Sequence, residues 1–245
     1  MKETQAIIER VRRINETHQH LYLAVDTSLT NIRAGQSVLA RVGAEWDPYL
    51  REQWYPVDIQ KNTLIVERPA TIRYEPGDIV SLIGAVGQPF KFRKTLRGVL
   101  LMAYETEPTA LLMTIPFLLA QPQKIAVTLL LLGSARDYTT QHLPPEVEIL
   151  QGDSDLQWAN RVTTIGWADQ VFVTVGDDDQ QFTRVWHLFQ ELRADIPPNY
   201  LWAVYRPVLP CGVGACSACL IKAKDGLHYV CTEGAALDMT KMTWG

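Results

Sequence analysis

The sequence predicts a chain of three parts: an antiparallel six-stranded β-barrel, then a parallel-sheet α/β domain, then a small C-terminal module. Short apolar runs separated by turn residues occupy residues 9–92, which is typical of a small barrel. Beyond residue 96, apolar strands alternate with helical patterns, which indicates a parallel sheet. All four cysteines lie between residues 211 and 231. The predicted boundaries are 1–95, 96–205 and 206–245.

The barrel is predicted from short strands that alternate with turns and show no helical period. Turn residues occur at 34–36 and again at 75–78, where a proline and a glycine stand together. Regular turns between such strands favour a closed antiparallel sheet. The expected strands are 21–25, 37–42, 54–59, 63–67 and 79–84.

The α/β domain is predicted from strands that are apolar throughout, as expected where helices cover both faces of a sheet. The helix expected at 181–192 has its apolar residues, among them Phe182, Val185 and Phe189, on one face. A second helix is expected at 109–120. The expected strands are 98–103, 124–133, 146–150, 170–175 and 200–205.

Composition narrows the classes of protein to consider. The formal net charge is −4 and no basic run occurs, so nucleic acid is not an expected partner. The most apolar stretch, 110–120, contains Pro116 and is too short to cross a bilayer, and the first residues lack the apolar run of a signal peptide. We expect a cytoplasmic protein in a reducing compartment, without a membrane span.

The cysteine spacing is the most specific signal in the chain. Cys211, Cys216 and Cys219 form a C-x4-C-x2-C pattern, and Cys231 follows after eleven further residues. This is the plant-type spacing of a [2Fe–2S] cluster, with three thiolates on one loop and a fourth further on. We therefore predict these four cysteines as the ligands of a [2Fe–2S] cluster.

The residues between the cysteines are those that a cluster loop needs. Gly212 and Gly214 allow backbone angles that bring N–H groups toward sulfur, and Ala215 is small enough for a close approach. A hairpin predicted from strands 220–224 and 227–230 would carry the fourth cysteine back to the loop.

Other uses of four cysteines remain open at this stage. Zinc also binds four thiolates, although its sites usually contain two C-x2-C pairs and this chain has one. Disulfides require an oxidising compartment, and unliganded structural thiols would not cluster in this way. His228 is interpreted as an ordinary strand residue, because four thiolates already complete the site.

The order of barrel, α/β domain and cysteine module resembles the electron-transfer subunit of dihydroorotate dehydrogenase B, a family of the ferredoxin–NADP reductase superfamily. The resemblance is carried by the cysteine loop and by four short segments. In that family the barrel binds FAD, the cluster lies near the flavin, and the subunit pairs with a catalytic flavoprotein. The four segments are 34–36, 47–51, 76–78 and 84–90, and the cysteine loop is 211–219.

The flavin motif departs from the family pattern, in which an arginine precedes an aromatic residue by two positions. If Trp54 is the aromatic residue, Glu52 stands where the arginine should be; if Arg51 serves, the register shifts by one. The resemblance offers a short set of residues for FAD, and the alternative is a barrel retained with an altered pocket. The set is Arg51, Trp54, Tyr55, Thr71 and Arg73.

The nicotinamide motif also departs from the family pattern, which places a glycine-rich turn after the first strand of the α/β domain. Here the stretch 103–109 has no glycine and carries Glu105 and Glu107, whose carboxylates would repel a phosphate. Further on, 176–179 adds three aspartates where the family usually has Gly-Pro. NAD(P) is therefore not an expected cofactor.

Two functions follow from these patterns. The first is electron transfer through the [2Fe–2S] cluster, as a flavoprotein-like subunit of an oxidoreductase complex with a protein redox partner. The second is an iron–sulfur adaptor or redox sensor that has lost FAD and NAD(P) binding and docks on a larger complex. No residue is predicted to perform acid–base or nucleophilic catalysis, because no such constellation stands out.

Overall fold

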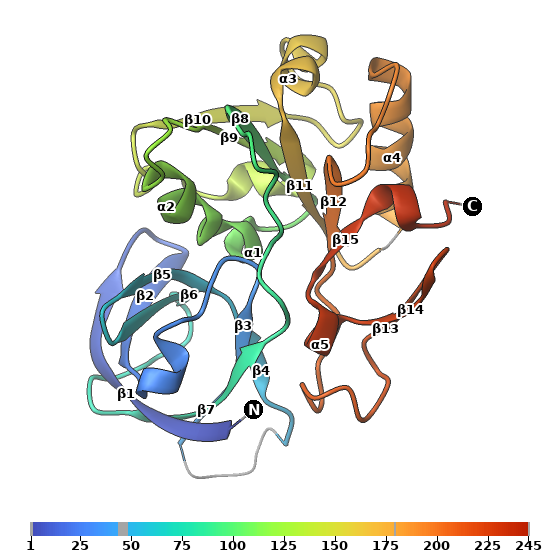
Figure 1. Cartoon of the computed structure of the whole chain (residues 1–245). Helices are drawn as coiled ribbons and strands as arrows, with labels where there is room; N and C mark the ends of the chain where they lie inside the picture. Colours follow the sequence, from blue (N-terminus) through green and yellow to red (C-terminus); the bar gives the residue numbers. More distant parts are fainter. Residues whose placement is uncertain (1, 44–48, 179, 245) are drawn as a thin grey trace. The chain divides into compact units, whose positions relative to one another are not determined.

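The structure is a computed structural model that describes residues 2–43, 49–178 and 180–244. Two compact units make up the chain (Figure 1). We call the first the barrel unit; it comprises residues 1–90, 207–220 and 229–234. The second, the sheet unit, comprises residues 91–206, 221–228 and 235–245. The predicted boundaries at 95 and 205 stay predictions.

The barrel unit contains one antiparallel sheet with the strand order β4-β3-β7-β1-β2-β6-β5. The two outermost strands, β4 and β5, follow each other in the chain with only Tyr55 between them. One bent strand therefore joins the two edges of the sheet and curls it into the predicted antiparallel barrel, which has seven strands where six were predicted. Its strands are β1 (Lys2–Arg13), β2 (His18–Ala24), β3 (Ser37–Val42), β4 (Glu52–Trp54), β5 (Pro56–Gln60), β6 (Thr63–Pro69) and β7 (Ile79–Val86).

Strand β1 was not predicted, since its sequence is mostly polar. Only Ala6 and Ile8 of its side chains are buried, and the residues that alternate with them, Gln5, Ile7 and Glu9, are exposed. The first half of β1 pairs with β7 and the second half with β2. One long strand thus supplies two sides of the barrel, with a bulge between Ile8 and Arg10 where it bends.

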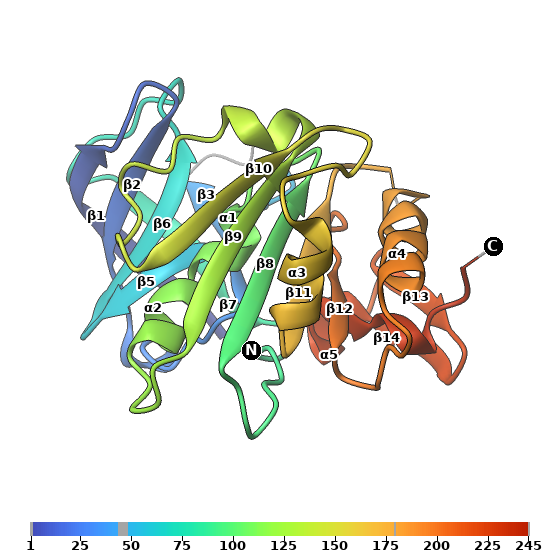
Figure 2. The same ribbon diagram turned by 90° about the horizontal axis from the view of Figure 1, so that it is seen from above.

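The sheet unit contains a six-stranded sheet with the order β10-β9-β8-β11-β12-β15, parallel except for β15 (Figure 2). The core strands are apolar along their whole length: residues 99–104 of β8 are fully buried, as expected for a sheet covered on both faces. The strands are β8 (Gly98–Tyr104), β9 (Ala126–Leu132), β10 (Val147–Gly152), β11 (Gln170–Val175), β12 (Leu201–Val204) and β15 (Ala236–Asp238).

The chain first adds β9 and β10 on one side of β8, and then crosses back to add β11 and β12 on the other side. Because the direction of the crossovers reverses, helices cover both faces of this sheet. Right-handed crossovers then place α1 and α2 on one face and α3 and α4 on the opposite face (Figures 1 and 2). The helices are α1 (Thr109–Leu112), α2 (Thr114–Leu119), α3 (Arg161–Trp167) and α4 (Gln180–Leu192), with 3-10 helices η2 (Gly133–Asp137) and η3 (Met239–Lys241). A further 3-10 turn, η1 (Thr27–Leu29), lies in the barrel unit.

The helix expected at 109–120 is divided in two at Met113. Pro116 has no N–H, so a continuous helix would lose the bond to the carbonyl of Leu112 at this point. The helix expected at 181–192 is confirmed as α4 with one extra residue. Among the described residues, no helix is long and apolar enough to cross a membrane.

The cysteine segment is an excursion between two neighbouring strands of the sheet. The chain leaves β12 at Tyr205 and returns into β15 at Ala235, where the N–H of Tyr205 donates to the carbonyl of Ala235 at 2.9 Å. Between these points lie β13 (Leu220–Ala223), β14 (Gly226–Tyr229) and α5 (Val230–Glu233). The excursion is closed at its base by the antiparallel pairing of β12 with β15.

Candidate metal centre

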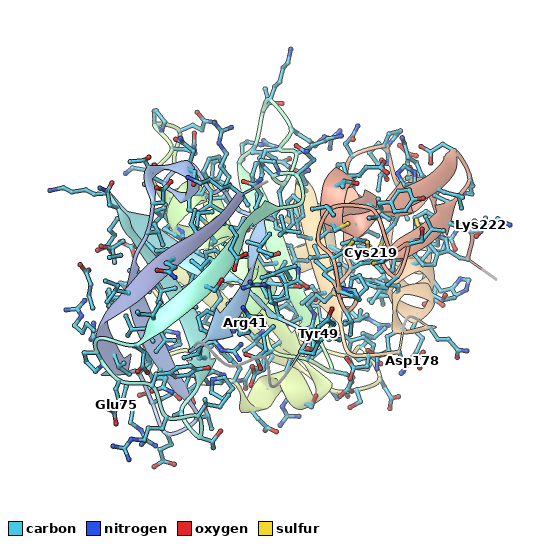
Figure 3. All side chains as sticks on the ribbon, turned by 90° about the horizontal axis from the view of Figure 1, so that it is seen from below. Arg41, Tyr49, Glu75, Asp178, Cys219 and Lys222 are labelled. Carbon is cyan, nitrogen blue, oxygen red and sulfur yellow. The ribbon has the colours of Figure 1, made fainter. Side chains whose placement is uncertain are left out.

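The structure brings all four cysteines together in the barrel unit. Cys211 and Cys216 lie on the loop after β12, Cys219 directly precedes β13, and Cys231 lies in α5. The hairpin that was expected to carry the fourth cysteine back to the loop is present as two strands that end at Tyr229, and Cys231 lies in the single helical turn that follows. Figure 3 shows sulfur atoms gathered around Cys219.

The four sulfurs divide into two pairs. Cys219 and Cys231 approach to 3.2 Å between their Sγ atoms, and the Cys211 and Cys216 thiols hydrogen-bond each other. Among the described residues, no three cysteine sulfurs lie within 4.8 Å of one another. A single zinc ion with Zn–S bonds of about 2.3 Å would hold four sulfurs roughly 3.8 Å apart, so two pairs fit a two-iron centre better.

The pairs differ in their exposure. Cys219 and Cys231 are buried, with 3% and 1% of their surfaces exposed, whereas Cys216 is exposed and Cys211 is half-buried. Burial, together with the neighbouring thiol of Cys219, raises the pKa of Cys231. Two buried thiols at this distance would both ionise only beside a cation, because a coordinating metal deprotonates its thiol ligands.

Backbone N–H groups surround the sulfur of Cys211. The N–H of Val213 contributes most, and those of Cys216 and Ala215 add to it; together they lower the pKa of Cys211 to about 6. Across the loop, the N–H of Gly214 donates to Cys231 Sγ at 3.1 Å. Such donors stabilise a thiolate and, around a cluster, raise its reduction potential.

Two glycines give the loop this shape, as predicted. Gly212 has φ +68° and Gly214 has φ +76°, both in the left-handed region that favours glycine. Gly212 also passes close to β3: a Cβ on it would lie 2.8 Å from a methyl carbon of Leu39. Ser217 adopts φ +59° without being a glycine, and nothing in the sequence indicated it.

The barrel itself holds the second half of the site. The N–H of Gly87 donates to the carbonyl of Cys231 at 3.0 Å, and the side-chain amide of Gln88 donates to the carbonyl of Thr232 at 3.1 Å. These residues follow β7, in the predicted exit segment 84–90. The exit is in turn tied to the predicted turn 34–36, since the N–H of Phe90 donates to the carbonyl of Ala34.

The residues predicted for FAD are not gathered into one place. Arg51, expected to meet a pyrophosphate, donates to the carbonyl and hydroxyl oxygens of Ser81 at 2.8 and 3.0 Å and pairs with Glu3 at 2.6 Å. Its guanidinium is therefore already neutralised by a carboxylate of this chain. The pKa of Glu3 is lowered, first by its bond from the Ser81 hydroxyl and then by Arg51, so this partner stays ionised.

The aromatic candidates lie in and beside the barrel core. Trp54 is 1% exposed; its indole N–H donates to Glu52, and its ring packs edge-on against Tyr74. Glu52 also pairs with Arg68 at 2.5 Å, so the carboxylate that displaced the family arginine has a cation of its own. Tyr55 is half-buried at the bend between β4 and β5.

The remaining candidates lie on the connection between β6 and β7. Thr71 is exposed, and Arg73 is exposed and paired with Glu75 at 2.6 Å. Asp47 and Pro48 of the predicted segment 47–51 lie outside the described residues, as does Asp179. As arranged, these residues do not fit a pyrophosphate, because their cations already have carboxylate partners; the FAD assignment stays a prediction.

Sequence reasoning missed three residues that shape these surroundings. Leu39 is the close neighbour of Gly212, while Glu3 and Ser81 occupy Arg51. Each of these contacts joins residues that are far apart in the sequence, so no local pattern could have indicated it. His228 lies in β14, as expected for an ordinary strand residue, and its ring hydrogen-bonds Asp225 at 2.7 Å.

No protein-family model matches the chain, and no curated protein matches it. Solved structures do match. One, of an NADH-dependent reduced ferredoxin–NADP oxidoreductase studied for flavin-based electron bifurcation, has TM-score 0.72 and 14% identity over 98% of this chain and 90% of that one. The ferredoxin reductase of carbazole 1,9a-dioxygenase has TM-score 0.60 and 14% identity over 82% of this chain and 68% of that one.

A third match is a ferredoxin NADP⁺ reductase from Neisseria gonorrhoeae with bound FAD and NADP, with TM-score 0.56 and 12% identity over 83% of this chain and 98% of that one. The chain therefore has the fold of the ferredoxin–NADP reductases. At this level of identity the likeness concerns the fold. The particular resemblance to the dihydroorotate dehydrogenase B subunit stays a prediction.

Proposed function

We propose that the chain is an electron-transfer protein whose four cysteines hold a [2Fe–2S] cluster, and that it works as a subunit of an oxidoreductase complex. Cys211 and Cys216 would bind one iron, and Cys219 and Cys231 the other. When bound, the cluster would supply one-electron redox chemistry. The observation that carries the proposal is the division of the sulfurs into two pairs with backbone N–H groups directed at them.

The chain's own residues would prepare this site. Gly212 and Gly214 turn the loop so that N–H groups point at sulfur, and Gly87 holds Cys231 against the barrel exit. Burial of Cys219 and Cys231 keeps water from one side of the centre. A reducing compartment such as the cytoplasm belongs to this proposal, because the ligands must be thiolates rather than disulfides.

The exposed side of the centre indicates where a redox partner would approach. Cys216 is exposed, and the loop around it, 207–220, has no charged residue. Val208 and Val213 on this loop are 69% and 51% exposed. A partner protein that receives or delivers the electron would therefore meet a loop without charged side chains.

A second candidate, an iron–sulfur adaptor or redox sensor without a flavin, is favoured by the arginines of the barrel. Arg51 and Arg68 are both paired with carboxylates, so an FAD pyrophosphate would have to displace Glu3 or Glu52. In the first candidate the barrel would hold a flavin, as the resemblance implies, and the flavin would supply redox chemistry beside the cluster. In the second, the barrel serves only to position the cysteine loop.

One experiment separates the candidates. The protein is purified without oxygen, and iron, acid-labile sulfide, zinc and released flavin are measured on the same sample together with a visible spectrum. Two irons and two sulfides per chain are expected. One FAD in addition makes the chain a flavin–cluster subunit, and its absence favours the adaptor. One zinc without sulfide would overturn both.

A further inference from the structure

The carboxyl edge of the parallel sheet is where dinucleotide-binding folds of this type hold a pyrophosphate. In such sheets the ligand lies beyond the strand ends, at the point where the strand order reverses, and backbone N–H groups at helix starts receive the phosphates. Here the order reverses between β8 and β11. The N–H groups at this edge include those that follow β9 and β11 and those that begin α4, all within the sheet unit.

The first of these donors is occupied by a carboxylate of the chain. Glu105 directly follows β8, and its side chain accepts a hydrogen bond from the N–H of Ser134 at 2.9 Å and another from the hydroxyl of Ser154. It lies over Gly133, where a Cβ would come within 2.0 Å of a carboxylate oxygen. Glu105 reaches this place by adopting φ +55°, which is uncommon for a residue other than glycine.

The other two donors are occupied as well. The N–H of Gly176, which follows β11, donates to the side-chain oxygen of Gln181 at 2.8 Å and to the carbonyl of Tyr104 at 3.0 Å. At the start of α4, the N–H of Gln180 donates to the carboxylate of Asp178 at 2.9 Å. Three side chains of the protein thus accept the bonds that ligand phosphates would accept.

We infer that Glu105 is a built-in anion that closes the dinucleotide site of the sheet unit, so that this unit binds no NAD(P). Gln181 and Asp178 complete the closure, and two of the three acceptors are carboxylates, which would repel a pyrophosphate as well as occupy its donors. The residues present do not fit the nicotinamide cofactor that the fold implies. The sheet unit then acts as a scaffold that holds the base of the cysteine excursion.

The inference does not rest on the cluster and is tested by binding. NADH and NADPH are titrated into the full-length protein and followed by calorimetry. Enzymes that use a substrate generally half-saturate below about 1 mM, and no saturable binding is expected up to that concentration. Binding in the micromolar range would overturn the inference. Iron and sulfide measured on the same samples report separately on the proposed function.

A variant tests the role of Glu105 itself. Inorganic pyrophosphate is added to wild type, to Glu105→Ala and to Glu191→Ala, a control that removes an exposed carboxylate of the same unit. Pyrophosphate is expected to raise the melting temperature of Glu105→Ala only, because the Ser134 N–H is then free for an anion. An equal change in melting temperature in all three proteins, or no change in Glu105→Ala, would show that Glu105 does not keep an anion away from the Ser134 N–H.

If Glu105→Ala does not fold, Glu105→Gln replaces it. Glutamine retains an oxygen that can accept from Ser134 and loses the negative charge. Its response to pyrophosphate is expected to exceed that of wild type. A wild-type response equal to that of Glu105→Gln would count against the carboxylate as the closing group.

Discussion

The cysteine loop and the carboxyl edge of the sheet both direct backbone N–H groups at a point where an anion belongs, but only one of them is closed. At the edge, Glu105 already accepts the N–H of Ser134. In the loop, the N–H groups of Val213 and Gly214 meet cysteine sulfurs, two of which are buried and crowded. A site that requires a ligand contains groups that the chain alone leaves crowded or without a counter-charge. The fold by itself does not distinguish such a site from one that the chain has closed.

The largest effect is expected when a cysteine is removed from the cysteine loop, the site that the chain leaves open. Cys216→Ser is expected to lose the iron and sulfide completely while the barrel stays folded, because the Cys216 side chain is exposed and is no part of the barrel core. Metal and sulfide content and circular dichroism measure the two outcomes. Val208→Ser, on the same exposed loop, is the control and should keep the cluster. A full complement of iron in Cys216→Ser would show that this cysteine is not a ligand.

A smaller effect is expected where the loop meets the barrel. Gly212→Ala imposes a left-handed backbone angle on alanine and places its Cβ against Leu39, a combined cost of about 1–3 kcal/mol. Gly43→Ala has a similar angle, φ +78°, but open space around it, so it carries only the backbone cost of about 1–2 kcal/mol. Urea unfolding and the rate of iron release are compared between the two.

Equal destabilisation by Gly212→Ala and Gly43→Ala would mean that the approach to Leu39 contributes nothing. If only Gly212→Ala speeds the release of iron, the contact with β3 helps to hold the cysteine loop in its ligating shape.

The smallest effect concerns the closed site and its dependence on pH. The Ser154 hydroxyl first, then the Ser134 N–H and Arg184, lower the pKa of Glu105 below its ordinary 4.5. Its contribution to stability is therefore present above pH 4.5 and lost as the pH falls through the lowered pKa. Because the group is only partly buried and solvent screens it, less than about 1 kcal/mol is expected.

This dependence is checked by urea unfolding of wild type and Glu105→Gln between pH 6 and the acid limit of solubility. The acid slope of wild type should be steeper than that of Glu105→Gln. Parallel curves would mean that Glu105 has the same pKa in the folded and unfolded chain.

Much of this architecture could be predicted from local patterns. The spacing of the cysteines indicated a common site, and Gly212 and Gly214 were expected to bend the loop, because a left-handed angle is a property of a single residue. Continuous apolar runs indicated β8 and β11, because a strand that is buried on both faces is nearly all apolar and can be recognised from its own residues alone.

What escaped prediction depends on contacts between distant residues. Strand β1 is polar enough to look like a tail, and its pairing with β7 joins opposite ends of the barrel sequence. The occupation of Arg51 by Glu3 follows from that pairing. In the sheet unit, the two acids after β8 were expected to repel phosphate, but the fold of Glu105 onto Ser134 depends on where β9 ends.

The pairing of β12 with β15 has a consequence for how the protein is made. Strand β15 follows the last cysteine in the chain, so during synthesis the edge of β12 stays uncovered until all four cysteines have left the ribosome. An uncovered edge is a template for pairing with other chains. A product that ends before Ala236 would therefore carry every cysteine and still expose this edge to aggregation.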